Sequence, residues 1–268
     1  MAIGINKIGN SCRRIGWRLL DWKYGTLALS LQRPEFGREK LRAQGYYSQY
    51  GQDKWIAETL LPGIESGVFV DVGAYDGVTF SNTLYLEERL GWTGLAVEPV
   101  PEIFEKLRRN RRCAVVNGCV ASRSGKASLQ VVSGYPDMLS GLVDKYDPRH
   151  RRRIGRECRI YGGECREIEV SCYRLNQLLE RYGIDYVDYL SIDVEGAEYS
   201  ILSTFDFGCC NISVIGVENN YKDRRIPRLL GEKGFKFHSV VGEEFYVRRG
   251  LAHNTALVHV RTSFEQRI

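Results

Sequence analysis

Long apolar runs are missing from this sequence, and so are internal repeats and low-complexity tracts. Asp21, Lys23 and Gly25 interrupt the apolar residues near the N-terminus, which excludes a transmembrane span and a convincing signal peptide there. Without a recurring period, solenoids and propellers are excluded as well. We therefore expect a soluble, folded protein with the cytosol as its default compartment. A surface helix in residues 11–32 that associates with a membrane is the alternative.

Paired cysteine motifs are also missing. The eight cysteines form no CxxC pair, and no nearby histidine completes a four-ligand metal set. In a chain of 268 residues they predict reduced thiols in or near the core, not a disulfide framework. The formal net charge of +5 is too small for a dedicated nucleic-acid binder. Composition thus indicates an ordinary globular protein and names no partner.

Short apolar runs alternate with helical patterns through the middle of the chain. We expect strands at 67–73, 94–98, 113–121, 187–194 and 212–218, with helices between them. This alternation implies parallel pairing through right-handed crossovers. Two further runs, on either side of Gly242 and Glu243, predict an antiparallel pair that closes the sheet. The predicted fold class is α/β, with a mostly parallel sheet flanked by helices.

Two regions depart from the alternating pattern. Residues 1–45 carry little strand signal and predict a helical N-terminal extension, which leaves residues 46–268 as the main domain. Residues 133–166 combine glycines and prolines with an arginine cluster at 149–159 and predict an insertion between sheet elements. This insertion is either a lid over the substrate or a solvated, charged helix.

The first predicted strand ends in a glycine turn, Asp71–Gly77, that opens a helix. Glycine lets the backbone approach a ligand, and ligands of parallel sheets bind at the carboxyl ends of the strands. Glu98 ends the next strand at that edge, where a carboxylate can accept hydrogen bonds from both hydroxyls of a ribose. Tyr75 and Val78 break the dinucleotide fingerprint, and the chain has no P-loop. These residues favour a nucleoside cofactor with an amino-acid end, and S-adenosylmethionine fits that description.

Three acids follow the later strands at the same edge of the sheet. We expect Asp193 to orient the cofactor or the acceptor, Glu195 to act as general base, and Glu218 to be a third catalytic acid. Two alternatives stay open. One of Asp193 and Glu195 caps the following helix, or the three acids hold a divalent cation; we favour a site without a metal. The histidines, His150 among them, are expected in surface or core roles.

Five separated segments occur in one order along the chain: YYSQYGQD from 46, FVDVGAYDGVTFSNT from 69, GLAVEPVPEIFEKLRRNR from 94, MLSGL from 138 and DYLSIDVEGAEYSIL from 188. Together they resemble the FkbM-type S-adenosylmethionine-dependent methyltransferases over residues 46–249. The resemblance implies a Rossmann-like methyltransferase fold with a seven-stranded sheet. It also implies O-methylation of a hydroxyl group on a small molecule, sugar or glycan.

Cofactor-binding residues are implied by the same resemblance. It places the glycine turn in the cofactor loop, Glu98 on the ribose, and residues 117–119 near the adenine. Gln49 and Gln52 are candidates for the methionine end, although Ser48 in the same segment could simply cap a helix. The expected cofactor-binding residues are Gln49, Asp71, Gly73, Ala74, Tyr75, Gly77, Glu98, Asn117 and Cys119.

Two other functions are considered beside this one. An RNA or protein methyltransferase would use the arginine cluster as a phosphate-binding surface, but Tyr146 and Tyr161 alone make a poor aromatic platform for nucleic acid. A non-catalytic binding protein of the same fold would lack affinity for the cofactor. The sequence predicts no oligomeric state.

Overall fold

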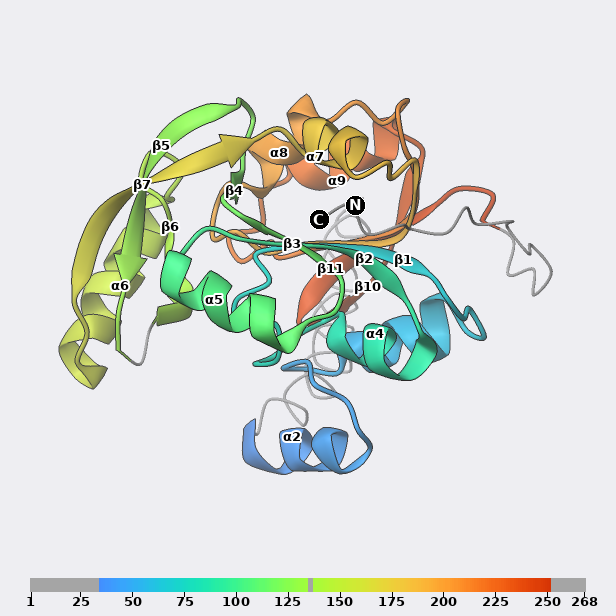
Figure 1. Cartoon of the computed structure of the whole chain (residues 1–268), viewed down its shortest axis with the longest axis horizontal. Coiled ribbons are helices and arrows are strands. Elements are labelled where there is room, and N and C mark those ends of the chain that lie inside the picture. Colours follow the sequence, from blue (N-terminus) through green and yellow to red (C-terminus); the bar gives the residue numbers. More distant parts are fainter. Residues whose placement is uncertain (1–33, 135–136, 252–268) are drawn as a thin grey trace, which may run out of the picture.

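The computed structural model describes residues 34–134 and 137–251, and its centre is a seven-stranded sheet (Figure 1). The strands lie in the order β10-β11-β9-β8-β1-β2-β3. Their bounds are β1 Val68–Val72, β2 Thr93–Glu98, β3 Ala114–Asn117, β8 Tyr186–Ile192, β9 Asn211–Val217, β10 Phe235–Val241 and β11 Glu243–Arg248. Pairing is parallel from β3 to β9, whereas β11 is antiparallel to both β9 and β10. The predicted fold class is confirmed, including the antiparallel pair.

Helices cover both faces of this sheet (Figure 1). One face packs against α7, α8 and α9 through Leu178, Ile201 and Leu230. The other packs against η1, α4 and α5 through Ile56, Leu86 and Leu107. The helix bounds are α2 Pro34–Ala43, α3 Gln52–Trp55, η1 Ile56–Leu60, α4 Leu84–Leu90, α5 Pro101–Asn110, α7 Leu175–Arg181, α8 Glu198–Thr204 and α9 Arg225–Glu232. Strands buried on both faces explain why their sequences read as unbroken apolar runs.

One predicted strand is two strands in the structure. The run at 113–121 divides at Gly118 into β3 and β4 Cys119–Val120, and β4 belongs to a second sheet with the order β4-β7-β5-β6. The other strands of that sheet are β5 Gly125–Val132, β6 Gly141–Leu142 and β7 Cys165–Tyr173. A Cβ atom at Gly118 would lie 2.8 Å from the Ser171 carbonyl oxygen. The chain therefore changes sheets where a side chain has no room, and the continuous apolar run concealed this change.

The predicted insertion at 133–166 is the connection from β5 to β7. It contains η2 Asp137–Leu139, β6 and α6 Pro148–Tyr161, so the arginine cluster lies on a helix. This helix begins where the Asp147 side chain accepts a hydrogen bond from the Arg149 amide and Pro148 takes the first position. His150 and Ile154 bury one side of α6 against the protein. The lid remains a prediction.

Helix α2 is the part of the predicted N-terminal extension that the structure describes. The expected surface helix at 11–32 lies outside the described residues. Within the described ranges, all helices are too short or too polar to cross a membrane. The cysteines in those ranges are free thiols, as expected.

Candidate active site

Strands β1 and β8 lie side by side at the centre of the large sheet, where the strand order reverses. A crevice opens at such a point, because the loops that follow the two strands diverge. Gly73 follows β1 with φ 91°, and a Cβ atom there would lie 1.8 Å from the Asp193 carbonyl oxygen after β8. Glycine is therefore required for these two loops to meet.

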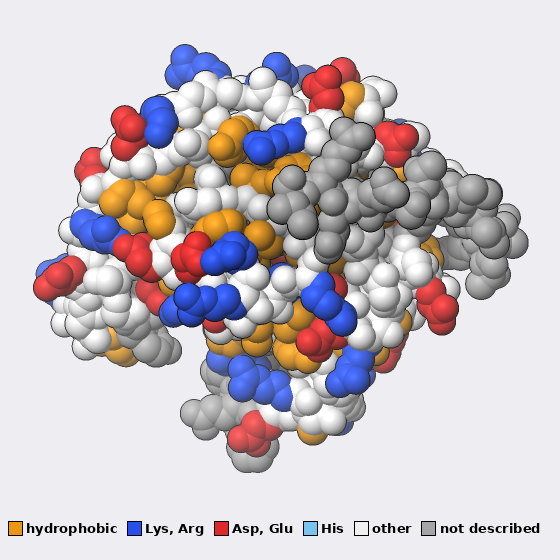
Figure 2. Space-filling model, in the orientation of Figure 1, with side chains coloured by type: hydrophobic (Ala, Val, Ile, Leu, Met, Phe, Trp, Pro, Cys, Tyr) orange, Lys and Arg blue, Asp and Glu red, His pale blue; other side chains and the backbone are white. Residues whose placement is uncertain are grey.

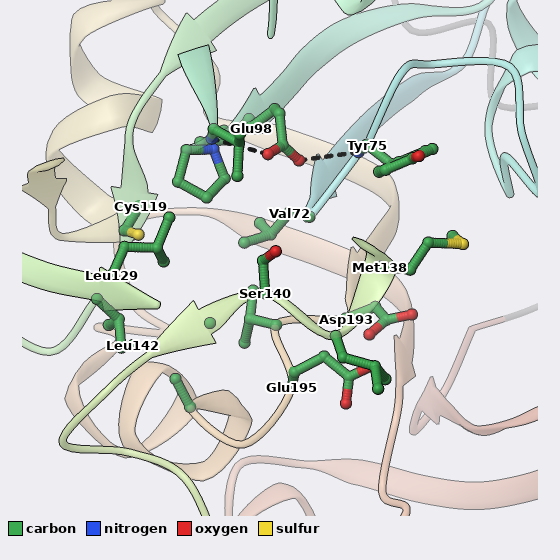
Figure 3. A pocket seen from close by; sticks show the side chains of 18 of the residues that line it. Val72, Tyr75, Glu98, Cys119, Leu129, Met138, Ser140, Leu142, Asp193 and Glu195 are labelled. Atoms are coloured by element: carbon green, nitrogen blue, oxygen red, sulfur yellow. Dashed lines mark hydrogen bonds between the residues drawn. The ribbon is translucent and has the colours of Figure 1, made fainter. Parts of the chain in front are cut away.

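A cavity of about 1070 Å³, including its open mouth, lies at this edge of the sheet. Figure 3 shows Glu98 and Tyr75 on one side of it and Asp193 and Glu195 on the opposite side. The second sheet and η2 supply the remaining wall, with Leu129, Met138, Ser140 and Leu142 among its residues. The predicted site residues that line this cavity are Gln49, Gly73, Tyr75, Glu98, Cys119, Asp193, Glu195 and Glu218.

The other predicted cofactor residues have structural contacts instead. Asp71 is buried and accepts a hydrogen bond from the Thr83 hydroxyl at 2.6 Å. Ala74 packs in the core, and Gly77 leaves no space for a Cβ beside Arg111. The Asn117 side chain donates to the Glu98 carbonyl oxygen at 2.9 Å. These residues shape the cofactor loop and the strand end from outside the cavity lining.

In the segment before α3, different residues face the cavity and stabilise the turn. Gln49 lines the cavity, whereas the Gln52 side chain accepts a hydrogen bond from the Tyr50 amide at 2.8 Å. Ser48 accepts from the Gly51 amide and donates to Asp53 at 2.5 Å. Ser48 therefore stabilises the turn that opens this helix, and Gln49 is the amide that faces the cavity.

Both oxygens of the Glu98 carboxylate are held by the backbone. One accepts from the Tyr75 amide at 3.1 Å and the other from the Val100 amide at 2.9 Å (Figure 3). Burial raises the pKa of Glu98 to about 7, although these two hydrogen bonds act in the opposite direction. Each oxygen keeps a free lone pair, so the carboxylate can accept two further hydrogen bonds from a ligand.

Asp193, Glu195 and Glu218 converge at the inner end of the cavity, each with one carboxylate oxygen within 4.8 Å of the others. Asp193 is exposed to the cavity, and desolvation by the surrounding protein together with the neighbouring carboxylates Glu218 and Glu195 raises its pKa above its usual range. Burial and Glu218 raise the pKa of Glu195 in the same way, while Arg153 opposes this shift. Glu195 also adopts φ 55°, a conformation that is rare outside glycine. The three carboxyl groups thus form an electrostatically crowded cluster, with backbone strain at Glu195.

His150 was not expected at this site, and the structure places it directly against Glu195. Its Nδ1 lies 3.2 Å from Glu195 Oε2 and 3.2 Å from the Tyr221 hydroxyl, and its Nε2 lies 3.2 Å from the Leu139 carbonyl oxygen. A carbonyl oxygen only accepts, so Nε2 carries the proton and Nδ1 offers a lone pair. Burial lowers the pKa of His150, which favours this neutral form.

The tautomer of His150 has a consequence for Glu195. Its Oε2 atom is buried and, among the described residues, has no hydrogen-bond donor. Facing a lone pair on Nδ1, this oxygen gains a hydrogen bond only by holding a proton itself. Glu195 and His150 can therefore share one proton. No local signal in the sequence identified His150, because it lies on α6 and meets Glu195 only through the fold.

The insertion also contacts the cofactor loop. The Tyr75 hydroxyl donates to Asp137 Oδ2 at 2.6 Å, and Tyr75 adopts φ 50° in the turn after β1. This hydrogen bond joins the loop to η2 at the edge of the cavity. Asp137 was not among the expected residues, since nothing in its surroundings distinguishes it from other loop acids.

Buried carboxyl groups predict how stability depends on pH. Burial raises the pKa of Glu98 and Glu198 to about 7 and that of Glu243 to about 8, from an unfolded value of 4.5. The folded protein therefore binds protons more tightly than the unfolded chain, and proton binding to these carboxyl groups stabilises the fold. This stabilisation is complete below the unfolded pKa and is lost as the pH rises through the folded pKa values. Burial lowers the pKa of His150 from its unfolded value of 6.5. His150 therefore makes the free energy of unfolding rise with pH, but only below pH 6.5.

We therefore expect the free energy of unfolding to fall between about pH 6.5 and 8. Urea denaturation of the ligand-free protein at several pH values measures it, and Glu243→Gln should flatten the slope. A free energy of unfolding that rises over this interval would contradict the assignment of buried, protonated carboxyl groups.

The sheet order and the cavity at its switch point define a Rossmann-like α/β fold. A family model described as Methyltransferase FkbM domain matches residues 71–237, and the chain belongs to this family. Methyltransferase sdnD of Sordaria araneosa is 28% identical over 222 residues, which cover 73% of this chain and 83% of that protein.

The solved structures that this chain resembles are much less similar in sequence. Methyltransferase FkbM from Methylobacillus flagellatus KT is 10% identical with a TM-score of 0.39, over 68% of this chain and 43% of that one. This chain thus spans less than half of that protein. A TehB-like SAM-dependent methyltransferase from Corynebacterium glutamicum is 12% identical with a TM-score of 0.36, over 82% of this chain and 96% of that one.

Proposed function

We propose that this protein transfers the methyl group of S-adenosylmethionine to a hydroxyl group of a small molecule, sugar or glycan. One observation carries the proposal: three carboxylates converge in the same cavity that Glu98 and the glycine turn line from the other side. A carboxylate that can accept hydrogen bonds from the ribose hydroxyls and a carboxylate that can remove a proton thus face the same cavity.

The cavity residues fit this cofactor. Glu98 offers two free lone pairs for the ribose, and the glycine turn lets the backbone come close beside it. An apolar wall that includes Ile103, Leu129 and Leu142 suits a flat adenine ring. Gln49 and Asp193 supply polar groups for the amino-acid end.

When bound, S-adenosylmethionine supplies an activated methyl group and a neutral leaving group. The protein's task is then to orient the acceptor and remove its proton. We assign the removal of the acceptor's proton to Glu195, because a carboxylate with a raised pKa is a better base near neutral pH. His150 is a positioning residue: its Nδ1 atom accepts a hydrogen bond from the protonated Glu195 carboxyl, the form that Glu195 takes once it has removed the acceptor's proton. Glu218 orients the acceptor hydroxyl beside it, while Asp193 orients the amino-acid end of the cofactor.

Removal of the Glu98 carboxylate tests the cofactor assignment. We expect Glu98→Ala to weaken binding of S-adenosylhomocysteine by about 1–3 kcal/mol, since charged hydrogen bonds to the ribose are lost. Isothermal titration calorimetry measures this, with Glu102→Ala on exposed α5 as the matched control. Unchanged affinity in a folded Glu98 variant would refute the ribose assignment.

Calorimetric titration of the unaltered protein tests the proposal as a whole. S-adenosylmethionine and S-adenosylhomocysteine should bind and NAD should not, in the presence and absence of Mg²⁺ or Mn²⁺. The spacing of the three acids also suits a divalent cation, so a metal requirement would make them ligands instead of bases. No binding of either adenosyl compound would favour the non-catalytic alternative.

The arrangement of arginines gives little support to an RNA methyltransferase. Arg149 pairs with Asp147, Arg153 with Glu157, and Arg151 donates to a backbone carbonyl. On the described part of the face shown in Figure 2, basic and acidic side chains are interspersed and no extended basic surface is visible. Nucleic acid binding would need a continuous positive surface.

A further inference from the structure

A second cavity adjoins the first one and has about 1090 Å³ of space, including its open mouth. Its walls come from residues before and at the start of α6, the turn before α8, and the loop at 218–224 between β9 and α9. Glu195 and Glu218 line both cavities. We call this second cavity the acidic-ended groove, because those two carboxyl groups line it where it meets the first cavity.

Methyl transfer is an in-line displacement, so the acceptor oxygen must approach from the side opposite the leaving sulfur. A site for this reaction therefore needs two spaces that meet at the reacting atoms. The first cavity and the acidic-ended groove meet at Glu195 and Glu218, where we have assigned proton removal. The groove is thus in the right place to receive the acceptor.

A first wall of the groove is a fixed Asp–Arg–Tyr unit at the start of α6. The Arg149 guanidinium makes two hydrogen bonds to Asp147, at 2.9 and 2.8 Å, and lies 4.6 Å from the centre of the Tyr221 ring. The Tyr221 hydroxyl in turn contacts His150 Nδ1 at 3.2 Å. This wall therefore connects the groove with the residue that positions Glu195.

A second unit of the same kind forms another part of the groove. Arg225 binds Asp223, with contacts of 2.9 and 2.6 Å, and lies 4.1 Å from the centre of the Tyr199 ring. Bidentate pairs of this geometry restrain both partners. Both units present flat, polar surfaces with many hydrogen-bonding atoms, and among the described residues of the lining Ile226 is the single aliphatic one. Such a groove suits a ring that carries hydroxyl groups better than an apolar ligand.

The loop of the groove carries two cations without an acidic partner. Lys222 and Arg224 are exposed, and within the described residues no carboxylate lies within 4.0 Å of either. Lys222 adopts φ 53°, and the Asn219 side chain fixes this loop by accepting from the Asp223 amide at 2.7 Å. Basic groups of this loop and the carboxyl groups of Glu195 and Glu218 thus line the same groove.

From this arrangement we infer that the groove binds a polyhydroxylated acceptor that carries an anionic group, a carboxylate or a phosphate. The hydroxyl to be methylated faces Glu195 and Glu218, and the anionic group pairs with Lys222 and Arg224. The inference rests on the proposed function, and it adds the charge of the acceptor and the residues that select it.

Binding of three sugar probes tests this inference. The protein is saturated with S-adenosylhomocysteine and titrated, by saturation-transfer NMR, with methyl β-D-glucuronide, glucose 1-phosphate and the uncharged methyl β-D-glucoside. We expect at least one anionic probe to bind about tenfold more tightly than the glucoside. The identity of the tighter probe shows whether the groove prefers a carboxylate or a phosphate. The double variant Lys222→Ala/Arg224→Ala should abolish the difference and keep the affinity for S-adenosylhomocysteine.

The matched control is Lys236→Ala/Arg249→Ala, because both residues are exposed at the opposite edge of the sheet. It should retain the preference for anionic probes. Equal binding of all three probes, binding of none, or a preference that survives the Lys222 and Arg224 changes would overturn the inference. Failure of the unaltered protein to bind S-adenosylhomocysteine would instead contradict the proposed function.

Discussion

Glu195→Gln is expected to lower the rate of methyl transfer by about 10²- to 10⁴-fold, the usual contribution of a general base. The substitution keeps the shape of the side chain and removes its ability to take the acceptor proton. Affinity for S-adenosylhomocysteine should change by less than about 1 kcal/mol, because Glu195 acts on the acceptor. Transfer of radiolabelled methyl groups to a hydroxylated acceptor found by screening measures the rate, and calorimetry measures the affinity.

Asp193→Asn provides the comparison within the same cluster. It should lower turnover more than it lowers stability, and a fully active variant would remove Asp193 from the mechanism. If Glu195→Gln retains full activity with a normal dependence on pH, Glu195 is not the base.

A change at His150 provides a further test, because we expect His150 to affect turnover only through Glu195. His150→Ala alone is expected to lower turnover and to shift the rising limb of the pH–rate profile. In the Glu195→Gln background, the same change should have little further effect on turnover, since the group that it positions is already inactive. A merely structural role would give additive losses and an unshifted profile.

Arg111→Ala is expected to destabilise the protein by about 3–5 kcal/mol, the range for breaking a buried ion pair. The Arg111 side chain is completely buried, and its Nε lies 3.0 Å from Glu87 Oε2. It also donates to the Thr83 hydroxyl at 3.0 Å, and that hydroxyl donates to Asp71. Removal of the cation would leave Asp71 without its positive neighbour and Glu87 with only the exposed Arg112, beside Gly77 of the glycine turn.

Arg112→Ala is the matched control, because the neighbouring arginine pairs with the same Glu87. Its side chain is 73% exposed and the ion pair is 3.8 Å long, so the expected loss is below about 1 kcal/mol. Urea denaturation at pH 7 distinguishes the two variants. Equal destabilisation by both would show that burial of the Arg111 network does not support the loop.

Much of the main sheet followed from local sequence patterns. Apolar runs of strand length alternate with amphipathic segments, and their order alone implies parallel crossovers. Glycine at position 73 and Glu98 at a strand end were identifiable for the same reason. A parallel sheet brings the carboxyl ends of its strands to one edge, wherever the residues lie in the chain. Asp193, Glu195 and Glu218 were placed at the site by this rule.

The second sheet could not be predicted in this way. Its short strand β4 continues the apolar run of β3, so periodicity alone cannot show that the chain changes sheets at Gly118. Asp71 shows a second limit of sequence patterns. Successive residues of a strand face opposite sides, and only the structure shows that Asp71 shares the side of Phe69, where it contacts Thr83 and lies near Arg111.

The sequence by itself thus determined the fold class, the family resemblance and the edge of the sheet at which the acids gather, because each depends on short-range patterns and chain order. Tertiary structure decided the partners of those acids. His150 and Tyr221 reach Glu195 from an insertion and a later loop, and Asp137 reaches Tyr75 from the same insertion. Such contacts join residues far apart in the chain, and their geometry arises only when the two sheets pack together.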